Sequence, residues 1–385
     1  MDKRLEIEFE NRLSKVRDEA AKRAFEALVV IGFAPRRAGD LMYLAGHMPL
    51  LPGHTRRFGC RSRGYSALLI PLHGEPSLIK GLPSGGIEYI KDVYADNDLA
   101  SALKKAIHKH GLERKDIGLV GSDILSVALY EDIRAECPNT RFYFADDLIQ
   151  NIRAQKNEYE LEIMRTGAQI SDEVAAELRQ FIRPGISERD VYAFITSQLQ
   201  KRGVTGAFAT CQSGERSEKV YYTEASDRIL QNGDFVHMEI NGKYKDYMID
   251  VCRTAVVGKI SPEQRHVLDT TVEMLSESCK AVRPGVVAED LEAIAGKIAL
   301  REGFTSNFSL AYNGPQTYLG HAIGLSVDEP PLLMKGDLTR LVPGMVLTLE
   351  PGLYNTGLGG CRVEDEVLVT EDGFEVLNTY DRIWW

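Results

Sequence analysis

A repeated eight-residue pattern constrains how the second half of this chain can fold. "RPGISERD" begins at Arg183 and "RPGVVAED" begins at Arg283, one hundred residues later. Each copy follows one helical pattern and precedes another, and its Pro-Gly pair marks the break between the two predicted helices. A repeat with a fixed offset and shared punctuation predicts two similar α+β halves. Strand-like runs containing acidic residues follow each helix pair, and we expect the two halves to place those strands around one cleft.

The first 152 residues follow a different pattern. Residues 9–33 indicate a helix that runs into a strand, residues 65–81 two strands joined by a turn, and residues 98–111 a helix stopped by Gly111. This alternation predicts a small α/β domain over residues 1–152. A long helical pattern with apolar residues at three- and four-residue steps follows, so we expect a second domain over residues 153–385.

Composition excludes several classes of protein. The chain has 385 residues, 44% of them hydrophobic and 26% charged, as is usual for a globular protein. Its net charge of −10 argues against a nucleic-acid partner, which needs a basic surface. No apolar run approaches the ~18 residues that span a bilayer, and the start "MDKRLEIEFENRL" has no signal-peptide pattern. The six cysteines are scattered, which predicts reduced thiols in a cytoplasmic enzyme without membrane contact.

One basic stretch, "HTRRFGCRSRGY" at residues 54–65, leaves two interpretations open. It can be a solvated loop. Alternatively, an arginine such as Arg61 contacts an anionic substrate, across a dimer interface if the protein is a dimer.

Acidic residues stand inside apolar runs in the second domain. Glu239 and Asp250 lie in "HMEINGKYKDYMIDVCRT", Glu350 ends "GMVLTLE", and Glu364 follows a glycine-rich bend, in "GCRVEDEVLV". His321 lies in "GHAIGL". A buried carboxylate is costly unless it is paired or binds a cation. For each residue alone a structural salt bridge is the better explanation, but the set predicts one site, and carboxylates with an imidazole suit Mn, Fe, Co or Zn.

These segments resemble the "pita-bread" family, which holds methionine aminopeptidase, Xaa-Pro aminopeptidase, prolidase and creatinase. The resemblance is carried by the strand before Arg253-Thr254, the "GHAIGL" loop, and the two glutamate strands "GMVLTLEPG" and "RVEDEVLVTEDG". It implies an α+β fold in which a C-terminal pita-bread domain, residues 153–385, follows a creatinase/prolidase-like α/β domain. It also implies a homodimer.

The resemblance further implies a set of metal ligands. The five family positions fall on Glu239, Asp250, His321, Glu350 and Glu364. The peptidases have aspartate where this chain has Glu239, whose side chain is one methylene longer. The resemblance therefore leaves open whether the site holds one ion or two. Glu350 is then the candidate proton shuttle, and His321 and Glu239 are further candidates for proton transfer.

Two other departures concern the substrate. The peptidases have a second histidine seven residues after the first, where this chain has Asp328, and a histidine upstream, where it has Tyr221 or Tyr222. Both changes argue against an ordinary Xaa-Pro peptidase. The candidate substrate contacts are Tyr221, Asp328, Arg61 and Arg362.

The predicted function is therefore a hydrolase of the Xaa-Pro aminopeptidase/creatinase type that cleaves a C–N bond, amide or peptide, of a small molecule or short peptide with the help of a divalent metal. Three alternatives remain open. The first is a metal-free, creatinase- or ectoine-hydrolase-like enzyme, the second is a lyase on the same fold, and the third is a non-enzymatic binding protein.

Overall fold

The computed structural model divides the chain into two compact units, Met1–Arg153 and Ala154–Trp385. It describes residues 3–33, 39–49, 62, 64–81, 84–86, 89–219, 224–304 and 317–385. Within these ranges, no helix is long and apolar enough to cross a membrane.

The first unit is built on a six-stranded sheet with the order β6-β4-β3-β1-β7-β8. The sheet strands are β1 (Ala27–Phe33), β3 (Tyr65–Pro71), β4 (Ser77–Lys80), β6 (Asp92–Ala95), β7 (Asp116–Val120) and β8 (Arg141–Phe144). The helices are α1 (Lys3–Lys22), α2 (Gly39–Ala45), α3 (Leu99–Lys109), α4 (Val127–Glu136) and α5 (Asp146–Ala154), and β2 (His47–Pro49) pairs with β5 (Ser84–Gly86). The helix expected to stop at Gly111 is α3, and Gly111 has a φ of 66°.

The second unit contains two larger sheets. The first has the order β10-β11-β12 with β9 paired to β11; its strands are β9 (Thr205–Phe208), β10 (Cys211–Ser213), β11 (Phe235–Tyr244) and β12 (Tyr247–Val256). The second has the order β14-β13-β15-β18-β19; its strands are β13 (Tyr318–Ala322), β14 (Glu329–Met334), β15 (Val346–Leu349), β18 (Asp365–Val369) and β19 (Phe374–Val376). The second unit also contains a short strand pair, β16 (Gly352–Leu353) with β17 (Cys361–Arg362), and a 3₁₀ turn, Gly214–Glu218.

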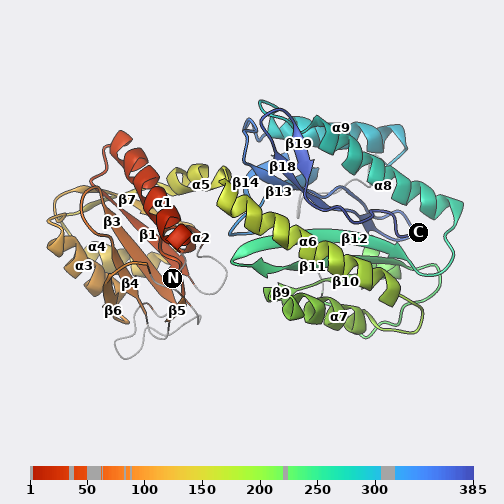
Figure 1. Cartoon of the computed structure of the whole chain (residues 1–385), viewed down its shortest axis with the longest axis horizontal. Helices are drawn as coiled ribbons and strands as arrows, with labels where there is room; N and C mark the ends of the chain where they lie inside the picture. Colours follow the sequence, from red (N-terminus) through yellow and green to blue (C-terminus); the bar gives the residue numbers. More distant parts are fainter. Residues whose placement is uncertain are drawn as a thin grey trace. The chain divides into compact units, whose positions relative to one another are not determined.

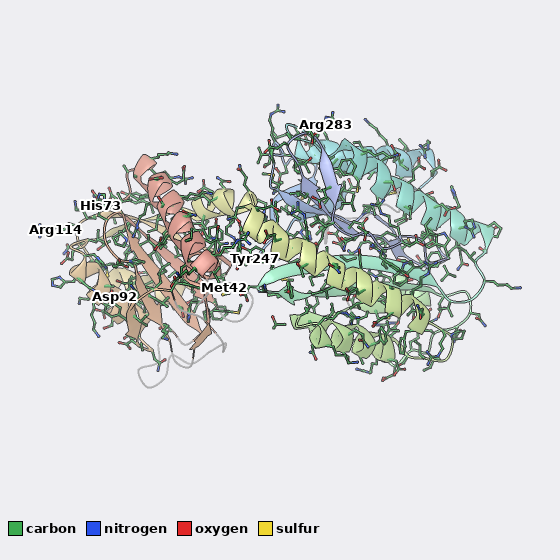
Figure 2. All side chains as sticks on the ribbon, viewed as in Figure 1. Met42, His73, Asp92, Arg114, Tyr247 and Arg283 are labelled. Carbon is green, nitrogen blue, oxygen red and sulfur yellow. The ribbon has the colours of Figure 1, made fainter. Side chains whose placement is uncertain are left out.

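Each sheet of the second unit has its own pair of helices (Figure 1). Helices α6 (Glu158–Phe181) and α7 (Glu188–Lys201) pack on the first sheet, and α8 (Pro262–Ala281) and α9 (Ala288–Arg301) on the second. Tyr247, labelled in Figure 2, begins β12, and its hydroxyl donates to Glu160 Oε1 of α6 at 2.6 Å. This bond holds α6 against the β11–β12 hairpin.

The two halves repeat the backbone contacts around the Arg-Pro-Gly segments. The Gly185 N–H donates to Leu230 O at 3.1 Å, and the Gly285 N–H donates to Leu341 O at 2.8 Å. Isolated bridges follow in the same relative place, Ser187 with Ile229 and Val287 with Arg340. The structure therefore confirms the internal repeat predicted from the sequence.

Strand register brings the polar segments of the second unit together. In the β11–β12 hairpin, Asn241 lies opposite Asp250 and Glu239 opposite Cys252. Because side chains alternate along a strand, residues 237, 239 and 241 share one face with residues 250, 252 and 254. The Glu364 N–H donates to Cys252 O at 3.0 Å, so the segment leading into β18 lies against this hairpin.

Candidate metal centre

Three of the predicted ligands form one compact buried group. Asp250 of β12, His321 of β13 and Glu364, which directly precedes β18, each offer a ligand atom, and these atoms lie within 4.8 Å of one another. His321 Nε2 is 3.6 Å from Asp250 Oδ2. Only pairing between distant strands produces this group, since its members are far apart in the sequence.

The histidine is held in an orientation that suits a metal ligand. His321 Nδ1 lies 3.0 Å from Ala322 O. A carbonyl oxygen can only accept, so Nδ1 donates to it and Nε2 is the ring nitrogen that faces the acids.

Two further acids lie beside the histidine. Glu350 Oε1 is 3.6 Å from His321 Nε2, and the Glu350 N–H donates to Leu319 O at 2.7 Å, which fixes this residue at the end of β15. Asp328 Oδ1 is 3.3 Å from the same nitrogen, but its side chain is 67% exposed. Asp328 therefore forms the solvent-facing side of the group.

Burial strongly disfavours the charged forms of these acids. It raises the pKa of Asp250 and of Glu350 well above the ordinary values, and the neighbouring Glu364 carboxyl raises both further. Burial also raises the pKa of Glu364, while the Arg362 guanidinium opposes that rise.

The donor atoms fit a divalent cation. Both oxygens of Glu364 are buried and have no hydrogen-bond partner among the described residues. Two carboxylates and an imidazole are ligands that Mn, Fe, Co and Zn accept. A cation at this point would relieve both the repulsion between the acids and the missing hydrogen bonds of Glu364.

Glu239 lies in a different group from the one formed by Asp250. It is clustered with His237 and Cys252, whose ligand atoms are again within 4.8 Å of its own. Its Oε1 is also paired with Arg362 Nη2, while Arg362 Nη1 lies 2.9 Å from Glu350 Oε2. Arg362 thus bridges two of the predicted acids, and the roles assigned to Glu239 and Arg362 stay predictions.

Two predicted substrate contacts, Arg61 and Tyr221, lie outside the described residues. Sequence reasoning also missed residues that belong to this region, namely His237, Cys252, Arg253, Asp365 and Glu366. A signal existed for the first two: His237 stands two positions before Glu239, and Cys252 two positions after Asp250. Side chains two apart on a strand share a face.

Comparison with known proteins matches residues 162–371 to the model of metallopeptidase family M24. The chain is 32% identical over 267 residues to a Xaa-Pro dipeptidase of Pyrococcus furiosus, covering 69% of this chain and 74% of that protein. It is 30% identical over 292 residues to a putative dipeptidase of Bacillus subtilis, covering 75% and 78%.

Solved structures show the same architecture over nearly the whole chain. A prolidase from Pyrococcus horikoshii superposes with a TM-score of 0.82 at 25% identity, covering 97% of this chain and 100% of the other. An X-Pro aminopeptidase from Thermotoga maritima gives 0.82 at 25% identity, covering 96% and 98%. The predicted fold, a small N-terminal α/β domain followed by a pita-bread domain, is confirmed.

Proposed function

The chain belongs to metallopeptidase family M24, and we propose that it is a metal-dependent hydrolase that cleaves the C–N bond of a dipeptide or of an amide of similar size. The names of the relatives, Xaa-Pro dipeptidase and putative dipeptidase, support the size and type of this substrate.

The observation that carries the proposal is the buried group of Asp250, His321 and Glu364, in which neither Glu364 oxygen has a hydrogen-bond partner in the described part of the chain. These three residues would hold the ion, with Glu350 beside them. When bound, a divalent ion supplies Lewis acidity, which polarises a scissile carbonyl and lowers the pKa of water.

The protein's own side chains would transfer the protons and position the reacting groups. Burial raises the pKa of Glu350, which favours a role for this carboxyl as the proton shuttle between nucleophile and leaving amine. Arg362 binds Glu350 Oε2 and would keep that carboxyl oriented. The exposed carboxylate of Asp328 offers an anionic contact. We therefore expect a preference for substrates with a cationic group at that position.

The test combines metal analysis with a substrate panel. The purified protein is analysed for metal, stripped with a chelator, reloaded with Mn²⁺, Co²⁺ or Zn²⁺, and assayed on Xaa-Pro dipeptides, other dipeptides and N-acyl amino acids. We expect hydrolysis that disappears with the metal and returns on reloading. Glu364→Gln should lose metal and at least about 100-fold in kcat/KM, a loss of roughly 2.7 kcal/mol. The exposed Glu371→Gln serves as the control.

A second candidate is a metal-free hydrolase or lyase acting on a small cationic molecule. The bridging of Glu239 and Glu350 by Arg362 favours it, because the protein then supplies its own cation to two of the predicted ligand acids. Full activity in metal-stripped protein would select this candidate over the first. The homodimer stays a prediction, and light scattering on the purified protein tests it.

A further inference from the structure

Tyr318 lies beside the candidate metal centre, although the strand pattern places it on the other face of the sheet. It begins β13, three positions before His321. Side chains three apart on a regular strand point to opposite faces. The two rings are nevertheless stacked, with their centroids 6.4 Å apart and their planes at 27° to each other. An irregularity in β13 must therefore turn Tyr318 toward the site.

A shift of register between β13 and β14 provides this turn. Tyr318 lies opposite Met334 and Gly320 lies opposite Leu333, so two steps along β13 match one step along β14. Residues that lie opposite each other in an antiparallel pair share a face. The extra residue of the bulge therefore moves Tyr318 onto the face that carries His321. Bulges re-aim side chains in this way beside active sites.

The neighbours of this tyrosine on β13 fix the geometry. Gly320 lies so close to β15 that a Cβ atom would overlap Thr348 O, so the strand can pass there only as glycine. Leu319 is fully buried in the core of this half. The Thr317 hydroxyl donates to Glu292 Oε1 of α9. The direction of the tyrosine side chain is therefore set by the fold on both sides of it.

The tyrosine hydroxyl contacts the acid that lies beside the histidine. The side chains of Tyr318 and Glu350 are hydrogen-bonded to each other, and a phenol O–H donates to a carboxylate. Glu350 Oε2 also lies 2.9 Å from Arg362 Nη1. Two donors from different strands, β13 and β17, therefore hold one carboxyl group. Tyr318 is only half-buried, so its hydroxyl can be removed without opening the core.

We propose that Tyr318 is a positioning residue for the Glu350 carboxyl. Its hydroxyl keeps its proton and donates one hydrogen bond, which together with the Arg362 contact restricts the carboxyl to one orientation toward the substrate. Orientation contributes to the rate because misplacing a reacting group by about 1 Å can cost about 100-fold. This proposal rests on the proposed function, in which Glu350 is the proton shuttle, and adds the residue that aims it.

Tyr318→Phe tests this role, because it removes the hydroxyl and keeps the ring on His321. We expect kcat for the dipeptide that is hydrolysed best to fall at least about tenfold while KM changes less than about twofold, since the aim of the carboxyl matters in the transition state more than in substrate binding. The metal content of the variant should equal that of the wild type. The matched control is Tyr192→Phe, on an exposed tyrosine of α7, which should leave both constants unchanged.

A double-variant cycle shows whether Tyr318 acts through Glu350. Once Glu350→Ala has removed the carboxyl, adding Tyr318→Phe should lower the residual kcat by less than about twofold. A tenfold loss in both backgrounds would overturn the proposal, because the hydroxyl would then act independently of Glu350.

Crystal structures of the wild type and of Tyr318→Phe give a readout that does not depend on turnover. We expect the Glu350 carboxyl to turn away from its wild-type position in the variant. Active wild-type protein with an unchanged kcat in Tyr318→Phe would overturn this proposal alone. A wild type without hydrolysis would contradict the proposed function, and an unmoved Glu350 carboxyl in the variant would then overturn the positioning role as well.

Discussion

At the scale of single residues, Arg253 fixes the backbone beside the candidate metal centre. Its guanidinium donates to Glu364 O at 2.5 Å, Cys252 O at 2.9 Å and Asp365 Oδ1 at 2.8 Å. Both Arg253 and Asp365 are fully buried, and the other Asp365 oxygen accepts from Arg382 Nε at 2.6 Å. Asp365 is therefore the carboxylate that pairs directly with the buried Arg253 cation.

Asp365→Ala should lower the free energy of unfolding by about 3–5 kcal/mol, because it leaves the buried Arg253 charge without its partner. Urea denaturation measures this loss. The matched control is Asp227→Ala, which breaks the exposed Arg189–Asp227 pair and should change stability by less than about 1 kcal/mol. Equal losses in the two variants would contradict the importance assigned to the buried pair.

The raised pKa of Glu366 predicts how the stability of the metal-free protein depends on pH. Burial raises its pKa from 4.5 to about 8, and its Oε1 accepts from the Asp250 N–H at 2.9 Å. The folded state then binds a proton that the unfolded state releases at lower pH, so stability falls as pH rises from about 4.5 to 8. The slope contributed by this group is at most about 1.4 kcal/mol per pH unit.

The measurement is urea unfolding of chelator-treated protein at pH 5, 6.5 and 8. Glu366→Gln cannot titrate, so its stability should decline less steeply over this range than that of the wild type. A variant with the same slope as the wild type would show that Glu366 is ionised in the folded protein.

At the scale of elements, the helix starts show where the internal repeat is imperfect. Ser187 caps α7 by accepting from the Asp190 N–H, and the Asp190 carboxylate accepts in turn from the Ser187 N–H. At the equivalent start of α9, Val287 provides no side-chain cap, although Asp290 occupies the position of Asp190. One residue of a capping box is therefore missing.

Val287→Ser should complete that box and stabilise the protein by about 1 kcal/mol. Thermal or urea unfolding measures the change. The reciprocal variant, Ser187→Val, should destabilise by a similar amount, and the double variant Val287→Ser/Asp290→Ala should lose part of the gain. Stabilisation that survives removal of Asp290 in full would point to a cause other than the box.

At the scale of the whole molecule, the two units have separate hydrophobic cores. One core of the first unit joins its sheet to α3 and α4, with Val29, Leu69 and Leu103 among its members. Two cores fill the second unit, one beneath each helix pair. We propose that the domains separate at the boundary predicted from the sequence, residues 152/153.

Residues 154–385 expressed alone should therefore fold, because the two cores described there are built from residues of the second unit. We expect a single cooperative unfolding transition and binding of Co²⁺ by the fragment. Circular dichroism with urea titration measures the transition. A fragment without cooperative unfolding would show that the second unit needs the first for stability.

Much of the fold could be predicted because local signals coincide with element boundaries. Apolar periodicity predicts α1, α3 and α6, and the Arg-Pro-Gly segments mark the break within each helix pair. Acids within apolar runs marked Asp250, Glu350 and Glu364, because burying a carboxylate requires a partner wherever it occurs.

The sequence by itself determined the two-part architecture, the internal repeat and the acids and histidine that a metal would need, since these depend on local periodicity and on the cost of burying charge. Only the tertiary structure decided how they are grouped. Strand register placed Glu239 opposite Cys252, and Arg362 paired with one of the Glu239 oxygens. The Glu239–Arg362 pair joins residues 123 positions apart, so no local pattern encodes it.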